Sequence, residues 1–357
     1  MSTATAVAAP PAVPWRVGRT FLHPAFDVLV IGGGLSLVLT AFFRTGLLSP
    51  ATAALGLSLP VLLFTSTLAH FASSTVRLYT KPDAFESHRF LTMGLPLVTM
   101  GVLALAVWQP GAVGRHLQAL YLTWSPYHYA AQAYGVAVMY CYRSGCALQP
   151  AEKTVLRVAC FAPFLQNFLS ASGAGLEWFV PQTVFLDHPW LFTVRGPLVA
   201  GLQALAFLLP AGLFGWLYRQ GRPLPLVSLL AVVANGVWWV VLVYADAFVW
   251  ATVFHGLQYL ALVLLFHVRE QTARPGNRRS ALYHAATFYA LSLGLGYLLF
   301  QLWPFAFVAA GFGWAESVLL VTATINVHHF VVDAYIWRLR KDPNYRVVTS
   351  APAEAAA

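Results

Sequence analysis

The sequence predicts an all-α protein, a polytopic integral membrane helical bundle of about ten transmembrane helices. Of its 357 residues, 59% are hydrophobic and only 9% are charged, whereas globular proteins carry about 25% charged residues. Apolar runs of about 18 residues or more recur along the chain, which is the length that a helix needs to cross a bilayer. Most of the chain is therefore expected to lie within a membrane.

Ten stretches have the length and composition of a transmembrane span. In chain order they are 26–43, 51–76, 90–108, 117–142, 154–176, 197–217, 224–244, 247–268, 282–303 and 314–337. Together they define a single transmembrane domain over 21–341. The two ends, 1–20 and 342–357, are expected to be disordered cytoplasmic tails. A Trp-Pro pair at the start of 303–314 leaves open the alternative that this segment is re-entrant.

Lysine and arginine are distributed unevenly between the two sides of these spans. With the N-terminus in the cytoplasm, 18 of the 21 Lys and Arg residues fall on the inner side, and only Arg44, Arg115 and Arg195 fall outside. This asymmetry follows the positive-inside rule and predicts that both termini are cytoplasmic. It also accounts for the net charge of +9 without a nucleic-acid partner. The expected partner is the lipid bilayer, and the expected location is the bacterial inner (cytoplasmic) membrane.

Five of the eleven histidines fall inside the predicted spans, where ionisable side chains are rare and mark functional sites. They are His70, His128, His255, His328 and His329. The four helices that carry them are predicted to run in the same direction. At about 1.5 Å per residue, the distance from each histidine to the next inner arginine is roughly 10–22 Å. The four helices can therefore converge on one layer, and the five histidines are the predicted ligands of a shared metal site.

Polar side chains near these histidines are expected to support the ligands. Gln132, Gln258 and Asn326 lie about one helical turn from a histidine, so they share its side of the helix. Asp333 follows His329 by four residues. The spacing predicts that Asp333 accepts the second ring N–H of a metal-bound His329, which would fix the tautomer of that imidazole.

Several neutral imidazoles in an apolar pocket favour iron, copper, zinc or nickel over magnesium or calcium. Iron is the first expectation and copper the second, since the chain has no His-Glu-x-x-His pair of the kind found in hydrolytic zinc sites. A redox metal inside a bilayer suits a hydrophobic small-molecule substrate, such as an acyl chain, an isoprenoid or a quinone, together with O2. The sequence thus predicts a membrane oxidoreductase or oxygenase, with Tyr259 as a catalytic donor of a proton or hydrogen atom.

Two other interpretations of the same histidines are open at this point. His128 and His255 are nearly level, which also suits the axial ligands of a b-type haem. Intramembrane histidines also serve transporters and proton- or ion-relay proteins. A lone histidine in a membrane helix commonly forms an interhelical hydrogen bond, but five at compatible depths favour a shared site.

Overall fold

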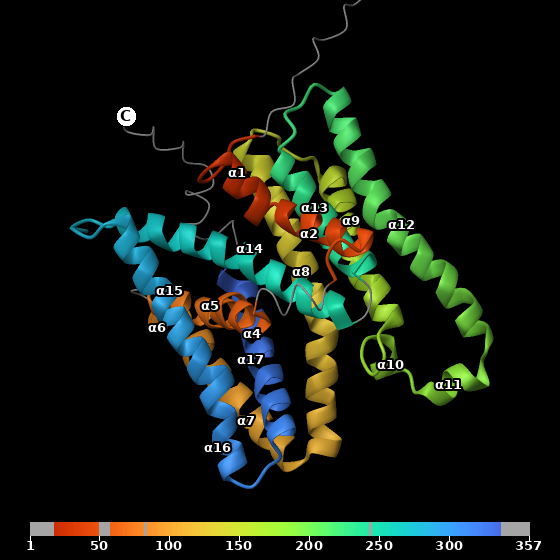
Figure 1. Ribbon diagram of the computed structural model, residues 1–357, viewed down its shortest axis with the longest axis vertical. Helices are drawn as coiled ribbons and strands as arrows, with labels where there is room; N and C mark the ends of the chain where they lie inside the picture. Colours follow the sequence, from red (N-terminus) through yellow and green to blue (C-terminus); the bar gives the residue numbers. More distant parts are fainter. Residues whose placement is uncertain (1–17, 50–57, 82–83, 243–244, 337–357) are drawn as a thin grey trace, which may run out of the picture.

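A computed structural model describes residues 18–49, 58–81, 84–242 and 245–336 (Figure 1). Within these residues 83% are helical and there is no strand, which confirms the all-α prediction. Six helices in the described residues are long and apolar enough to cross a membrane. A further pair, Pro24–Ile31 with Gly34–Thr45, is bent by 54° and makes a seventh if it counts as one span. The described chain is therefore a helical membrane bundle.

The helices differ widely in length, and several are extended by a π-helical turn, labelled η. In chain order they are α1 (Pro24–Phe26), η1 (Asp27–Ile31), α2 (Gly34–Thr45), α4 (Leu59–Leu62), η2 (Leu63–Leu68), α5 (Ala69–Tyr79), α6 (Ala84–Ser87), η3 (Phe90–Gly94), α7 (Leu95–Trp108), η4 (Pro110–Gly114), α8 (Arg115–Arg143), α9 (Pro150–Ser170), α10 (Leu176–Phe179), α11 (Gln182–Asp187), α12 (Trp190–Arg219), α13 (Leu226–Val240), α14 (Ala245–Thr272), α15 (Ala281–Tyr297), η5 (Leu298–Leu302), α16 (Trp303–Ala309) and α17 (Trp314–Ile336).

The six candidate spans correspond to six of the ten predicted ones, and the other four overlap the bent pair, α8, α9 and α13. Helices α8 and α9 are long enough to span but less apolar, and α13 has only 15 residues. The segment 303–309 continues the helix of α15 and η5 as α16, and the chain turns after Ala309. The predicted tail 342–357 and most of 1–20 lie outside the described residues.

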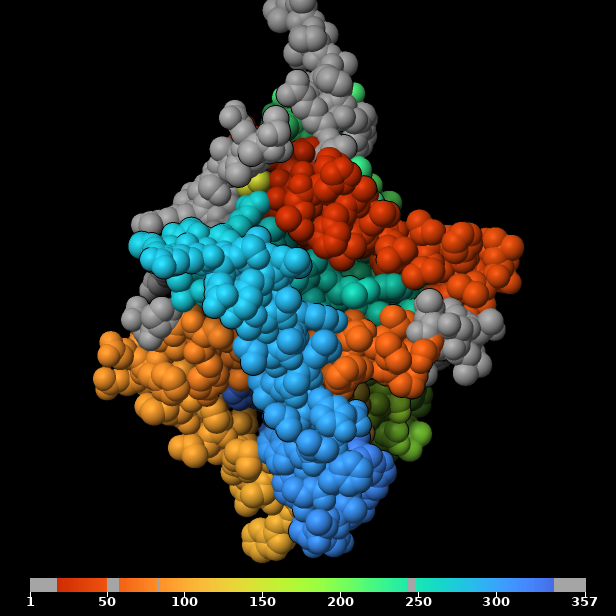
Figure 2. All heavy atoms as spheres, turned by 60° about the vertical axis from the view of Figure 1, so that its left-hand side comes forward, coloured from red at the N-terminus to blue at the C-terminus, as the bar shows by residue number. Residues whose placement is uncertain are grey.

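Helix α8 joins two groups of helices (Figure 1). In one group, α8 and α13 pack against α9, which packs along α12. In the other, α17 packs against α8, α7 and α5, and α15 packs against α5 and α14. Figure 1 shows α14 running across the direction of α8 and α17. From the side shown in Figure 2, α15 and α16 lie at the front and cover most of α17.

Two glycines let neighbouring helices approach the π-helical turn η2, which directly precedes α5 and its His70. A Cβ on Gly296 of α15 would lie 2.8 Å from the Leu68 carbonyl oxygen, and a Cβ on Gly256 of α14 would lie 3.3 Å from that of Ser66. Small residues at such points allow close contact between membrane helices. The two contacts fix the backbone that carries His70 within the bundle.

A buried carboxylate holds the N-terminal part of the described chain. Asp27 accepts hydrogen bonds from the Phe21 amide at 2.5 Å and from the Tyr140 hydroxyl at 2.6 Å. Its side chain is fully buried, so these bonds offset much of the cost of removing a carboxyl group from water. They position η1, whose last carbonyl, that of Ile31, accepts a hydrogen bond from the side chain of Gln258 on α14.

Replacing Gly296 by alanine is expected to lower the stability of the protein by about 1–3 kcal/mol, because the new methyl group would overlap a backbone oxygen that cannot rotate aside. Gly294→Ala is the matched control, since Gly294 lies on the same helix, is exposed, and has nothing within 4 Å of an added Cβ. Thermal unfolding of both variants in detergent measures the difference. Equal melting temperatures would contradict the close approach of α15 to η2.

Candidate metal centre

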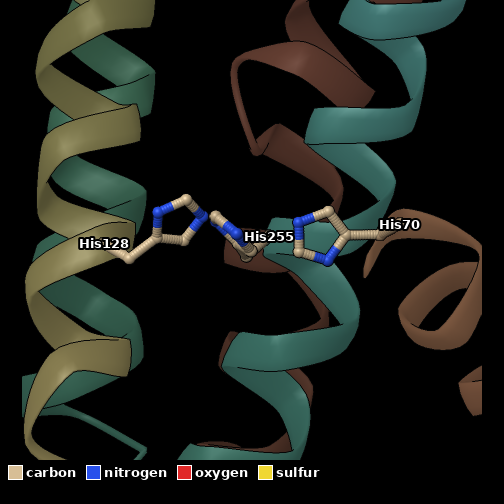
Figure 3. Close-up of side chains that lie close together, drawn as sticks. All are labelled: His70, His128 and His255. Carbon is tan, nitrogen blue, oxygen red and sulfur yellow. The ribbon is translucent and has the colours of Figure 1, made fainter. Parts of the chain in front are cut away.

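Four of the predicted histidines lie together where α5, α8, α14 and α17 meet. They are His70, His128, His255 and His329. Figure 3 shows three of them, with His255 between His128 and His70. The closest ring centres, those of His70 and His329, are 4.5 Å apart. His128 is 8% exposed and the other three are fully buried. The structure thus brings four imidazoles from four helices to one point inside the bundle.

Three atoms with lone pairs converge at one side of this cluster. His329 Nε2 lies 3.3 Å from His128 Nε2 and 3.4 Å from Asp333 Oδ2, and the last two atoms are 3.7 Å apart. The circle through three atoms at these separations has a radius of about 2.0 Å, so one point lies about 2.0 Å from all three. Zinc, for comparison, binds nitrogen and oxygen ligands at about 2.0–2.2 Å. The three atoms are therefore spaced so that they could hold one metal ion.

Ser74 of α5 determines which nitrogen of His329 faces this point. Its Oγ lies 2.9 Å from His329 Nδ1 and 3.2 Å from the carbonyl oxygen of Phe71. A hydroxyl has one proton to donate, and the carbonyl can only accept it, so Oγ accepts the Nδ1–H of His329. The Nε2 lone pair of His329 is then directed toward the other two atoms. A hydrogen bond to the far nitrogen orients metal-bound imidazoles in this way.

Asp333 has a different position from the one that its spacing predicts. The far nitrogen of His329 is bonded to Ser74, while Asp333 Oδ2 lies on the Nε2 side, among the converging atoms. The other oxygen, Oδ1, accepts a hydrogen bond of 2.6 Å from the hydroxyl of Tyr259 on α14. Asp333 is only 5% exposed, and a buried carboxylate requires a compensating charge or hydrogen bonds. An ion at the equidistant point would provide that charge directly.

His70 and His255 complete the cluster, and their ring nitrogens have the fewest hydrogen bonds in it. All four of their ring nitrogens are buried and have no hydrogen-bond partner within the described part of the chain. One nitrogen of each lies within 4.8 Å of a ring nitrogen of His128. A buried polar atom without a partner is unfavourable by about 1–3 kcal/mol, and such atoms in native proteins commonly indicate an unseen ion or water. Both histidines are therefore available as further ligands.

The remaining predicted site residues lie around the cluster or apart from it. His328 is partly buried and belongs to neither group of converging ligand atoms among the described residues. It is adjacent to His329, so it points about 100° away around the helix. Gln132 donates to Gln258 Oε1 at 2.7 Å, which links α8 to α14 beside the cluster. Asn326 donates to the carbonyl of Thr322 on its own helix at 2.8 Å.

Two neighbours of the histidines are absent from the set of predicted site residues. Ser74 follows His70 by four residues, and this helical spacing is a signal that could have identified it. Tyr129 stacks on the ring of His255 with centres 4.0 Å apart and forms a 2.8 Å hydrogen bond to Thr252. It gave no comparable signal, because consecutive residues point to different sides of a helix.

An apolar cavity adjoins the converging atoms. It has a volume of about 360 Å³ and lies between α8, α14 and α17. His128 and Asp333 form part of its wall, together with Tyr259 and the aromatic rings of Trp124 and Phe330. A molecule in this cavity would contact two of the three converging residues directly.

Comparison of the chain with models of protein families, with curated proteins and with solved structures gives no match. The assignment of the site therefore depends on the geometry of this chain alone.

If Ser74 orients a metal-bound His329, then Ser74→Ala should weaken metal binding by about 10–100-fold, the usual effect of losing such a supporting hydrogen bond. Ser73→Ala is the matched control. Ser73 is equally buried, but its hydroxyl donates to the backbone carbonyl of His70 and not to an imidazole nitrogen of the cluster. Titration of the metal-depleted variants with iron(II) measures both affinities. An unchanged affinity in Ser74→Ala would remove Ser74 from the site.

Proposed function

We propose that this chain is a membrane-embedded, histidine-ligated metalloenzyme, an oxidoreductase or oxygenase that acts on a lipophilic substrate. One observation carries the proposal: His128, His329 and Asp333 present three atoms spaced for one ion, and the apolar cavity reaches two of these residues. Catalytic metal sites keep a coordination position open, whereas structural sites are closed by protein ligands. An ion held here would have its open side toward the cavity.

Iron is the preferred ion and copper the second choice. Two histidines and one carboxylate with open positions are typical of non-haem iron(II) sites that use O2. His70 and His255 add imidazoles at the same point, and imidazole also suits copper. Because the two groups of converging atoms share His128, we propose one ion per chain. Acyl chains, isoprenoids and quinones are the candidate lipophilic substrates, and O2 is the proposed second substrate.

Tyr259 has the position required of a donor to bound substrate. Its ring lines the cavity, and its hydroxyl is held 2.6 Å from Asp333 Oδ1. A proton or hydrogen atom given up by this hydroxyl would therefore leave from a point beside the ion. In the same position, Tyr259 keeps Oδ2 of Asp333 turned toward the histidines.

A b-type haem fits the packing of the histidines less well. Axial ligands stand on opposite faces of a planar macrocycle, which needs open space between and around them. The rings of His128 and His255 meet edge to face with centres 5.0 Å apart. The rings of His70 and His329 pack against them, with centres 4.8 and 5.0 Å away. Four imidazoles packed around one another favour a metal ion without a porphyrin over a haem.

A transporter or a proton relay is the alternative from another class of protein. A relay would use the same intramembrane histidines to pass protons along hydrogen-bonded groups. We favour the enzyme because His128, His329 and Asp333 converge beside an apolar cavity.

The number of membrane spans and the side on which the termini lie belong to the same proposal. We infer that the bent pair, α8, α9 and α13 cross the membrane beside the six candidate spans, so that the ten predicted spans hold. The division of the Lys and Arg residues, 18 against three, supports cytoplasmic termini and is that expected in a bacterial inner membrane.

Metal analysis is the direct test of the proposal. Protein purified in detergent without chelator is expected to contain about one equivalent of iron or copper per chain, because the two groups of converging atoms share His128. Inductively coupled plasma mass spectrometry gives the content, and a visible spectrum without a Soret band excludes haem. Folded protein with no bound metal would overturn the metalloenzyme and favour the relay.

The adjacent histidines of α17 provide a matched pair of variants. His329→Ala is expected to abolish most metal binding, because it removes a ligand, and Asp333→Asn should lower it less, since an amide oxygen can still coordinate. His328→Ala should leave the metal content unchanged, because His328 points away from the cluster. Metal content, measured with the melting temperature as a check on folding, separates these outcomes. Loss of metal in His328→Ala with retention in His329→Ala would reverse the assignment.

A further inference from the structure

The cavity beside the metal centre extends along one face of α8. Trp124, His128, Gln132, Gly135 and Met139 line it at spacings of three or four residues, which places them in a row along the helix. From Trp124 to Met139 this row spans 15 residues, or about 22 Å at 1.5 Å per residue. A volume of about 360 Å³ along such a length describes a narrow groove, suited to an extended chain.

The residues that line this groove disfavour a charged ligand. Among the described residues, Asp333 is the one charged residue in its wall, and no lysine or arginine lines it. With an ion at the metal centre compensating Asp333, a carboxylate or phosphate elsewhere along the groove would still have no cationic partner among the described residues of the wall, which is unfavourable at low dielectric. The remaining wall is mainly apolar or aromatic and includes Leu262 and Phe330. The ligand that fits is uncharged along its length.

Gln132 links α8 to α14 in the wall of the groove. The side chain of Gln258 donates to the Ile31 carbonyl, so its own oxygen is the atom that accepts from the Gln132 amide. Gln132 follows His128 by one turn and lines the groove, and its own amide oxygen is buried within the wall. The bond between the two glutamines therefore fixes this part of the wall.

The groove is accessible from the side of the bundle. Tyr127 of α8 is 43% exposed, and Ala334 of α17 is also exposed. Both residues belong to the wall of the groove. In a membrane bundle the exposed helical surface faces lipid, so a chain dissolved in the bilayer can enter between α8 and α17.

We propose that this groove binds an extended, uncharged hydrocarbon chain, such as a long-chain alcohol, which lies along α8 and enters from the bilayer. The proposal rests on the function given above, since the chain would be the substrate of the metal centre. His128 lies four residues from Trp124 and eleven from Met139, or about 6 and 17 Å along the helix. The reacting carbon therefore divides the bound chain unequally, with the longer arm toward Met139.

The test is photo-crosslinking of the metal-loaded protein with a long-chain alcohol that carries a diazirine in mid-chain. The label is expected on peptides that contain 124–139, and the corresponding fatty acid should compete poorly. Gly135→Leu should lose most of the label, because nothing lies within 4 Å of a Cβ at Gly135 and the new side chain projects into the groove. Gly101→Leu on α7 is the control, since Gly101 is exposed and equally open around its Cβ.

A second variant, Ala334→Trp, narrows the mouth of the groove from α17 and should also lose most of the label. Labelling of Gly135→Leu and Ala334→Trp at the level of the wild type would overturn the groove, and equal labelling by the fatty acid would overturn its preference for uncharged chains. Metal content, measured on the same samples, separates the two proposals. Metal without label in 124–139 refutes the groove alone, whereas label without metal refutes the metal centre alone.

Discussion

The convergence of lone pairs at one point is the constraint on which this structure depends. His128, His329 and Asp333 direct three electron-rich atoms toward one another within 3.7 Å in the interior of the bundle. Such an arrangement is repulsive unless a cation or a shared proton occupies its centre. The surrounding hydrogen bonds keep two of these three side chains from rotating away. Ser74 holds His329 and Tyr259 holds Asp333, and each hydrogen bond comes from a different helix.

The sequence predicts the fold class and most of the cluster because both depend on composition and depth. Few charges and long apolar runs are sufficient to define membrane helices, and a histidine inside such a run stands out against its neighbours. His70, His128, His255 and His329 were identified in this way. The same signal does not place α8 and α9 among the candidate spans, because they carry more polar residues than a typical span, and polarity is the signal from which spans are counted.

The sequence does not predict the direction in which a side chain points around its helix, or the angles at which the helices cross. The adjacent residues His328 and His329 have equal depth, and only packing against α5 and α8 determines that His329 faces the cluster. Asp333 shares a face with His329, but the sequence could not show that Ser74 on another helix takes the far nitrogen. Depth along a span can be compared between helices only when the helices are parallel, whereas α14 runs across α8 in Figure 1. Side-chain partners on different helices depend on these crossings, which a single sequence does not encode locally.

The position of the ligands along the chain has a consequence for biosynthesis. His128 and His329 are 201 positions apart, and α17 is the last helix of the described chain. The ribosome must therefore synthesise the chain as far as α17, and the membrane must receive that helix, before the proposed coordination sphere can close. Metal acquisition would then depend on the insertion of α17, and a chain truncated before α17 would lack His329 and Asp333, two of the three converging residues.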